Sequence, residues 1–343
     1  MSQATAVDEL QETATWIIDS GDAPAAMAAS ASAIAIAGAG GTLLVISRDG
    51  RRLGGAAVPT GLLTAAWSPD GRVLALGGPG GAQLWTAEDG LISLPVSGWC
   101  SALAWSVAGQ LAVASDRIAV VFDVANPASA TALWQTPEAP STITALAWLR
   151  AGRELAVAAY GGVKAFTKGK LKPARSLDYV GSLLDIATSS DGRWLVSGNQ
   201  DASVHIWRLR DGAELEMSGF PSKVSQVEFH PDGRWLFADG GEQPTIWDFA
   251  GSGPGGRQPA MLEVNGRAGS TRFSWNPQAP LVAVADSTGV VRLWDATQLT
   301  AGESDAAHVR LVGAMEPVTA LAWLGSDSLL VATQSGRVAM LGP

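Results

Sequence analysis

Short apolar runs alternate with polar turns along almost the whole chain, and the unit that ends near residue 223 shows the pattern most clearly. One apolar run stops at the Asp191-Gly192 turn and a second follows it. A polar tip at 198–201 then leads to an alternating run that ends in Trp207. A second turn, Asp211-Gly212, opens a fourth run. Alternation with a period of two and tight Asp-Gly turns predict four antiparallel strands, which we name a to d in chain order.

The same unit recurs along the chain when it is aligned on the last residue of strand a, which is usually aromatic. These residues stand at positions 29, 67, 105, 148, 188, 229, 275 and 323, at intervals of 38 to 48 residues. A repeat of about 40–45 residues with four short strands is typical of a β-propeller blade. The sequence therefore predicts an all-β protein that forms a single closed propeller.

The ends of the c strands carry a resemblance to a known family. Trp-Asp pairs occur at 247–248 and 294–295, and a Phe-Asp pair occurs at 122–123. The chain thereby resembles the WD40 repeat proteins over about residues 14 to 343. In that family a histidine before strand a usually joins a buried network with an aspartate, and no unit here has this histidine. We expect Asp201 and Asp286, which stand where that aspartate does, to be structural and to bond to backbone or hydroxyl groups.

The number of d strands predicts how the ring closes. Eight sets of strands a to c need eight d strands, but only seven d strands follow their units. An unpartnered apolar run with Trp16 lies at 14–19, and its pairing with the last three strands would remove two exposed sheet edges. We therefore predict eight blades, with residues 1–13 as a flexible tail and residues 14–343 as one domain. Seven blades, the alternative, would require residues 23–47 to form no blade.

Composition and charge narrow the range of partners. The 343 residues carry a formal net charge of −9, and hydrophobic residues make up 47%. Such an acidic chain lacks the basic surface that nucleic acids and anionic membranes require, and we interpret the four lysines at 164–172 as a solvated hairpin. The stretch at 23–39 is too weakly apolar for a membrane helix, and the first sixteen residues lack a signal-peptide pattern. We expect a soluble, cytoplasmic monomer.

Candidate chemistry is sparse. The possible soft ligands Cys100, His205, His230 and His308 fall on different strands and turns, so we predict no zinc site and no cofactor. A weak Ca²⁺ or Mg²⁺ site made of carboxylates stays open. A single cysteine cannot form an intrachain disulfide, and we expect Cys100 to be a small buried residue. No G-x-S-x-G motif occurs, and the glycine-rich tip at 77–81 lies between strands rather than before a phosphate-binding helix.

The d–a and b–c loops share one face of a propeller of this type, here called the top face. These loops carry the aromatic, amide and charged side chains considered as a binding surface. Aromatic, amide and charged residues are the types that anchor protein interfaces. The binding surface predicted on this face consists of Trp99, Arg117, Tyr160, Tyr179, Asn199, Gln200, Phe220 and Lys223. Its expected centre is the sector around Tyr160, Tyr179, Asn199 and Phe220. The a strands, rich in Ala, Leu, Val and Trp, predict a mostly inert wall around the axis.

These features favour a non-catalytic protein-interaction scaffold. Two alternatives stay open. The segments 181–207 and 217–224 resemble uncharacterised bacterial WD40 proteins often found beside CobW-type GTPases, which implies a part in metal homeostasis through docking of such a GTPase. The second alternative is an enzyme whose site at the mouth of the top face uses Asp116, Asp201, Asp239 or Tyr160 as acid or base.

Overall fold

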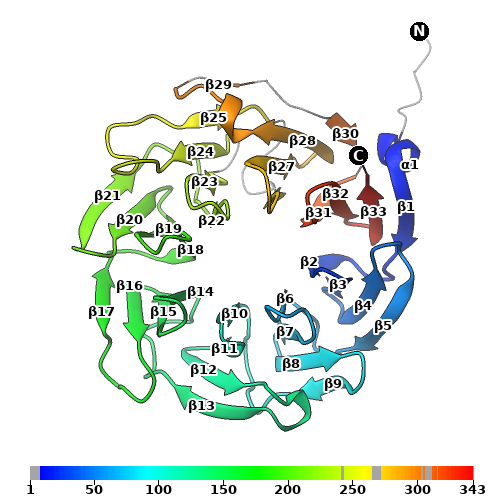
Figure 1. The fold of residues 1–343 in the computed structure, drawn as a ribbon, viewed down its shortest axis with the longest axis horizontal. Helices are drawn as coiled ribbons and strands as arrows, with labels where there is room; N and C mark the ends of the chain where they lie inside the picture. The colour runs from blue at the N-terminus through cyan, green and yellow to red at the C-terminus, as the bar shows by residue number, and fades with distance from the viewer. Residues whose placement is uncertain are drawn as a thin grey trace.

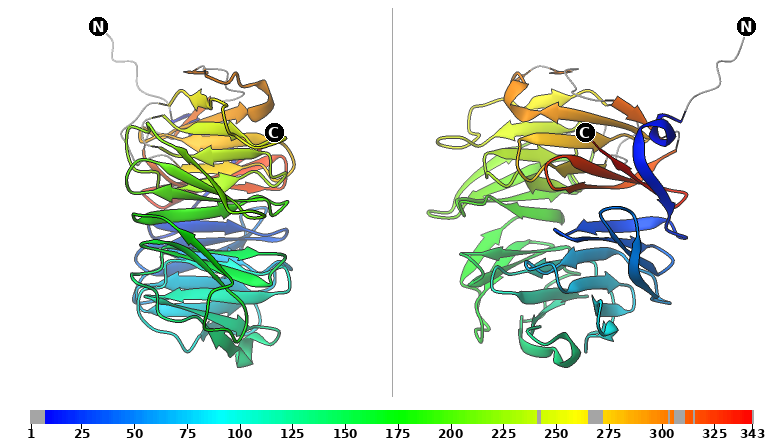
Figure 2. Two further views of the ribbon diagram at one scale, coloured as in Figure 1. Left: turned by 90° about the vertical axis from the view of Figure 1, so that its left-hand side faces the viewer. Right: turned by 45° about the vertical axis from the view of Figure 1, so that its right-hand side comes forward.

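The computed structural model describes residues 8–240, 243–264, 272–302, 304–305, 311–314 and 316–342. Their strands form eight sheets arranged in a ring, with the first strand of most sheets innermost (Figure 1). Seen from the side, the ring is thinner than it is wide (Figure 2). The predicted all-β propeller of eight blades is therefore confirmed, and the seven-bladed alternative is wrong.

Blades 1 to 4 follow the chain, each with strands a to d in order. Their bounds are Pro24–Ala29, Ala33–Gly38, Thr42–Ser47 and Arg52–Ala57 (β2–β5); Thr64–Trp67, Leu74–Gly78, Gly81–Thr86 and Gly90–Ser93 (β6–β9); Leu103–Trp105, Gln110–Ser115, Ile118–Asp123 and Thr131–Gln135 (β10–β13); and Ala145–Leu149, Glu154–Ala159, Gly162–Phe166 and Arg175–Asp178 (β14–β17).

Blades 5 to 8 continue the same order, and only the last borrows its outer strand from the N-terminal part of the chain. Their bounds are Leu183–Thr188, Trp194–Asn199, Val204–Arg208 and Ala213–Met217 (β18–β21); Val227–Phe229, Trp235–Ala238, Thr245–Asp248 and Ala260–Leu262 (β22–β25); Arg272–Trp275, Leu281–Ala285, Val290–Asp295 and Leu311–Gly313 (β26–β28 and β30); and Val318–Leu324, Ser328–Thr333 and Arg337–Leu341 (β31–β33). Outside this pattern, the short strand β29 (Ser304–Asp305) pairs in parallel with β25, and two 3₁₀ turns cover Pro127–Ser129 and Ala296–Gln298.

The N-terminal strand β1 (Ala14–Asp19) closes the ring, as predicted. It pairs antiparallel with β33, so that Trp16 lies opposite Met340. The indole Nε1–H of Trp16 also donates a hydrogen bond to the carbonyl oxygen of Arg48 in blade 1, at 3.0 Å. The first strand therefore completes blade 8 and fastens it to blade 1 (Figure 1).

The segment just before β1 differs from the flexible tail that we expected. Residues Glu9–Thr13 form a one-turn helix, α1, and its Leu10 is fully buried in the cluster between blades 7 and 8. The Glu9 carboxylate accepts a hydrogen bond from the backbone N–H of Gly313 at 2.9 Å. One apolar side chain and one carboxylate thus hold this turn against the ring, while residues 1–7 lie outside the described residues.

The core lies between the blades rather than in the middle of the ring. The described part of the chain forms eight clusters of buried apolar residues, and each cluster joins two neighbouring blades. In one of them, Val121 of blade 3 lies with Val157 of blade 4. This arrangement follows from the alternation of the strands, because each sheet turns an apolar face to both of its neighbours.

The inner wall, which we expected to be mostly inert, carries charged side chains in blades 5 to 7. Their innermost strands carry Asp185, Glu228 and Arg272. The Asp185 carboxylate accepts a hydrogen bond from the backbone N–H of Val227 in the next blade at 3.1 Å. The guanidinium of Arg272 donates to the carbonyl oxygen of Thr319, also in the next blade, at 2.9 Å. Asp185 and Arg272 thus join neighbouring inner strands through hydrogen bonds to backbone groups.

Candidate functional site

The top-face loops are held together in pairs by carboxylates. In blade 3, Asp116 of the b–c loop accepts a hydrogen bond from the backbone N–H of Trp99 in the d–a loop, at 3.1 Å. In blade 6, the buried Asp239 accepts bonds from both the backbone N–H and the hydroxyl of Ser225, each at 2.8 Å. Asp22 in blade 1 and Glu316 in blade 8 make the same kind of link in the opposite direction, from the d–a loop to the b–c loop. We call these contacts loop staples.

The staple of blade 5 uses a tyrosine. The Tyr179 hydroxyl, in the d–a loop, donates to Asp201 at 2.5 Å, and the Ser203 hydroxyl donates to the same carboxylate at 2.8 Å. Tyr179 thus stands before strand a, where the WD40 family usually has its histidine, and it reaches the aspartate of the b–c loop. Its ring also packs against the imidazole of His205, with ring centres 5.2 Å apart.

The blade-5 network fixes the protonation of its members. Burial raises the pKa of Tyr179 to about 12, and the hydrogen bond to Asp201 adds to this shift. Partial burial acts to raise the pKa of Asp201, but the hydrogen bonds from Tyr179 and Ser203 outweigh it and hold that pKa below its ordinary value. A neutral phenol donating to a carboxylate is therefore the stable arrangement at neutral pH.

Asn199 does not take part in the predicted binding surface. Its side chain is fully buried, its Oδ1 accepts from the Ser197 hydroxyl at 2.9 Å, and its Nδ2 donates to Ser203 at 3.0 Å. The expectation that Asn199 is free to bind a partner is wrong, because strand β19 runs on to Asn199 and turns this side chain inward. The neighbouring Gln200 is exposed.

The carboxylates considered for catalysis serve separate blades. Asp116, Asp201 and Asp239 belong to blades 3, 5 and 6, and each bonds to the d–a loop of its own blade. Asp286 in blade 7 is fully buried and accepts hydrogen bonds from the backbone N–H groups of Thr288 and Val290 and from the Thr288 hydroxyl, as expected, and it also pairs with the guanidinium of Arg292 at 2.6 Å. Asp116, Asp201 and Asp239 thus each form part of a loop staple in a different blade, whereas Asp286 bonds within the b–c hairpin of blade 7.

The candidate metal ligands are also dispersed. The described part of the chain contains no group of three His, Cys, Asp or Glu side chains placed to hold a metal ion. His205 lies against Glu214, His230 lies against the carbonyl oxygens of Asn276 and Ala279, and His308 is outside the described residues. Cys100 is fully buried, and this burial raises the pKa of its thiol to about 11.

Three large apolar side chains stand out from neighbouring blades on the top face. Trp99 is 45% exposed in blade 3, Tyr160 is 55% exposed in blade 4, and Val180 is 94% exposed in the loop that enters blade 5. Val180 is missing from the predicted surface, because a lone valine at the end of a strand carries no pattern that marks it as exposed. Beside Tyr160, a groove of about 240 Å³ is lined by Pro137, Pro140, Leu171 and other residues.

A chain of hydrogen bonds joins these loops across blades 3 to 5. The b–c loop of one blade bonds to the d–a loop beside it, and that loop bonds to the next b–c loop. The successive links are Trp99 to Asp116, Arg117 to Ala139, Ser141 to Tyr160, Gly161 to Gly181, and Ser182 to Gln200. We call this stretch of the top face the relay sector. It places Trp99, Arg117, Tyr160, Val180 and Gln200 in a fixed order on one surface.

Two further residues of the predicted surface, Phe220 and Lys223, lie at the margin of the relay sector. Phe220 is half-buried, with its ring against the backbone at Gly240, where it packs on the core between blades 5 and 6. Lys223 is exposed. Arg117 donates to Ala139 through Nε and forms an ion pair with Glu138 at 3.0 Å, so its guanidinium is oriented along the surface.

Comparison with known proteins agrees with this fold. Residues 173–208 match the family model for the WD domain, G-beta repeat. An uncharacterized WD repeat-containing protein of Synechocystis sp. is 39% identical over 74 residues, and the match spans only 21% of this chain and 21% of that protein. The crystal structure of the computationally designed Ika8 protein has a TM-score of 0.76 at 19% identity and covers 95% of this chain and 98% of its own.

The protein is thus a β-propeller that carries a WD40 repeat, and the resemblance to WD40 repeat proteins is confirmed. The matched repeat includes Tyr179, Asp201 and Trp207, which form or adjoin the staple of blade 5. Within the described residues, no helix has the length and apolar character needed to cross a membrane.

Proposed function

We propose that this protein is a non-catalytic scaffold that binds a protein partner through the relay sector of its top face. The observation that carries the proposal is the exposure of Trp99, Tyr160 and Val180 on three adjacent blades of one face. Propellers with WD40 repeats typically bind protein partners, which supports the same reading. Aromatic side chains with apolar neighbours are the residues that supply most of the binding energy of protein interfaces.

The hydrogen bonds of the relay sector support this proposal because they prepare the surface before binding. Ordering a loop upon association costs about 0.5–1.5 kcal/mol for each side chain that is immobilised. Here Asp116 holds the backbone of Trp99 at 3.1 Å, and the Ser141 hydroxyl holds the backbone of Tyr160 at 2.9 Å. The groove beside Tyr160 offers a place for an apolar side chain of the partner.

The test is co-purification from host cells of wild type, the triple variant Trp99→Ser/Tyr160→Ser/Val180→Ser, and the control Leu215→Ser. Leu215 is 38% exposed on the outer strand of blade 5, away from the relay sector. We expect the same partner to co-purify with wild type and with Leu215→Ser, and to be lost with the triple variant. The three proteins should have similar melting temperatures, because all four substituted side chains are partly exposed. Retention by the triple variant, or no partner with wild type, would contradict the proposal.

The identity of the partner is a separate question. The resemblance stated above predicts a CobW-type GTPase, with a part in metal homeostasis, and this stays a prediction. Mass spectrometry of the protein recovered with wild type and lost with the triple variant identifies the partner. A partner that is no GTPase would reject this finer prediction and leave the scaffold proposal intact.

A further inference from the structure

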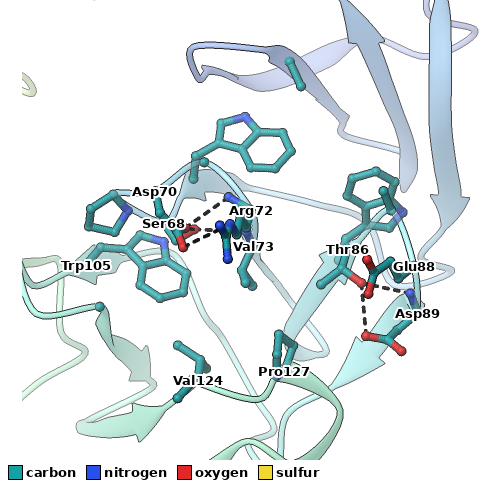
Figure 3. A pocket seen from close by; sticks show the side chains of 18 of the residues that line it. Ser68, Asp70, Arg72, Val73, Thr86, Glu88, Asp89, Trp105, Val124 and Pro127 are labelled. Atoms are coloured by element: carbon teal, nitrogen blue, oxygen red, sulfur yellow. Dashed lines mark hydrogen bonds and ion pairs between the residues drawn. The ribbon is translucent and has the colours of Figure 1, made fainter.

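A large hollow lies on the face opposite the relay sector. It has a volume of about 1080 Å³ and is formed by the a–b and c–d turns of blades 2 and 3 together with the adjoining part of blade 1. Figure 3 shows it from close by, with the Asp70–Arg72 turn facing Glu88 and Asp89, while Trp105, Val124 and Pro127 come from blade 3. We call this hollow the bottom groove.

The walls of the bottom groove are aromatic and fixed in position. Trp67 and Trp105 line it, and each donates its indole N–H to a carbonyl oxygen of the preceding blade, at 3.2 and 3.0 Å. The ring of Trp85 packs edge-on against that of Trp67, with ring centres 6.3 Å apart. At the rim, Val107 is 76% exposed and Leu53 is 42% exposed. These groups present rigid apolar surface to whatever enters.

The rim of the bottom groove is acidic. Its lining includes Asp70, Glu88, Asp89 and Asp123, whereas the only cation among the described lining residues is Arg72. Arg72 lies 3.8 Å from Asp70, so these two charges offset each other. The Ser68 hydroxyl donates to Asp70 and lowers the pKa of that carboxyl, and the Thr86 hydroxyl bonds to Asp89. The groove therefore keeps an excess of negative charge at neutral pH.

We propose that the bottom groove binds a peptide segment of a partner protein that presents an arginine or lysine next to an apolar side chain. A cation over the face of a tryptophan is attracted by the ring, and rim carboxylates add to this attraction. An apolar neighbour fits against Val107 and the indole walls. A second copy of this chain is disfavoured as the occupant, because its net charge is −9.

The groove and the relay sector lie on opposite faces, so this inference does not depend on the proposed function. It adds a second docking surface of defined chemistry, formed by blades 1 to 3. One partner could be bound on each face, and a variant on one face leaves the other intact.

The first experiment selects ligands without assuming a sequence. A phage-displayed library of random heptapeptides is panned on the full-length protein, with removal of clones that also bind Glu88→Lys/Val107→Lys. Both side chains are exposed, so this variant is expected to fold normally. We expect enrichment of peptides with arginine or lysine beside an apolar residue. The absence of enrichment, or enrichment without basic residues, would overturn the proposal.

The second experiment measures one enriched synthetic peptide by fluorescence anisotropy. Removing two rim charges in Glu88→Gln/Asp123→Asn should weaken binding about tenfold, and Arg72→Gln should strengthen it about threefold, because each exposed charge contributes modestly. Binding should also weaken as salt is raised. Equal affinity for all three proteins would overturn the proposal. So would loss of binding in the Trp99→Ser/Tyr160→Ser/Val180→Ser variant, which would assign the peptide to the top face.

Sedimentation velocity tests the competing occupant. A dimer of the wild-type protein that dissociates in Glu88→Lys/Val107→Lys would show that a second copy fills the groove, and this outcome contradicts the proposal. A monomer in both proteins, together with peptide binding by wild type alone, is the expected result.

Discussion

The indole Nε1–H of Trp148 donates a hydrogen bond to the carbonyl oxygen of Ala104, 3.0 Å away in the preceding blade. The tryptophans that end strand a in four other blades make the same contact with the blade before them. These are Trp67, Trp105, Trp275 and Trp323, which bond to Ala28, Ala66, Glu228 and Ser274. The repeated aromatic is therefore a lock between successive blades.

Replacing one lock residue should loosen the ring. We expect Trp148→Phe to lower the free energy of unfolding by about 1–3 kcal/mol, because the Ala104 carbonyl loses its partner and the smaller ring packs less well. The matched control is Trp134→Phe, on the outer strand of blade 3, where the ring is also half-buried and the indole N–H bonds to none of the described residues. Urea unfolding measures both variants. An equal loss in the two would show that the lock contributes nothing beyond ring volume.

The chain contains two tyrosines, and they provide a matched pair for the staple of blade 5. Tyr179→Phe removes the hydroxyl that donates to Asp201, and we expect it to destabilise the protein by about 1–2 kcal/mol. Tyr160→Phe removes an exposed hydroxyl and should change stability by less than about 0.5 kcal/mol. Thermal unfolding of both variants at pH 7 is the measurement, and equal melting temperatures would reject the staple.

The inner carboxyl of Glu228 should make stability depend on pH. Burial raises its pKa to about 7, the charge of Asp185 adds to the shift, and the ordinary value is 4.5. The folded protein therefore holds a proton that the unfolded chain releases, so stability from this group is present below about pH 4.5 and is lost as the pH rises to about 7.

Glu228→Gln removes this dependence. Glu228 is exposed to solvent on its inner strand, and this screening reduces the gain at pH 8 to only about 1 kcal/mol, or about 1–2 °C in melting temperature for a chain of 343 residues. At pH 4 the variant and wild type should melt together, since the carboxyl is then mostly protonated in both the folded and the unfolded chain. Glu263→Gln, an exposed carboxyl next to β25, is the control and should show no such change. A gain that is the same at both pH values would contradict the assignment.

Ring closure by β1 predicts the effect of truncation. Removal of residues 1–19 leaves the edge of β33 unpaired, and we expect a lower melting temperature and self-association through that edge. A synthetic peptide covering residues 8–19 should restore both properties, since it contains Leu10 and β1. Light scattering after size-exclusion chromatography reports the association. A monomer of unchanged stability would show that β1 is dispensable.

The repeats could be predicted from sequence because the residues that define them make the same contact in many blades. The tryptophan at the end of strand a recurs because it bonds to the preceding blade, as Trp67, Trp105 and Trp148 do. The run with Trp16 has no repeat around it because its strand completes blade 8. The inner charges were harder to anticipate. Asp185 and Glu228 interrupt apolar strands at single positions, and only the ring brings them close enough to interact.

The loops could be predicted only in part, because a shift of one residue in where a strand ends decides whether a side chain points inward or outward. The tip expected at 198–201 begins two residues later, because β19 extends to Asn199, which turns that side chain inward and leaves Gln200 outside. The bottom groove has no pattern of its own in the sequence. Its carboxylates belong to separate turns of blades 2 and 3, and their common position depends on how those blades pack.

The most direct test of the scaffold proposal is photo-crosslinking in host cells. A photoreactive phenylalanine analogue replaces Tyr160, which is 55% exposed at the centre of the relay sector, or Leu215 as the control. The proposal predicts one dominant crosslinked protein from position 160, its absence from position 215, and its loss when Trp99→Ser/Val180→Ser is added. No crosslinked product from position 160, or the same products from both positions, would contradict it.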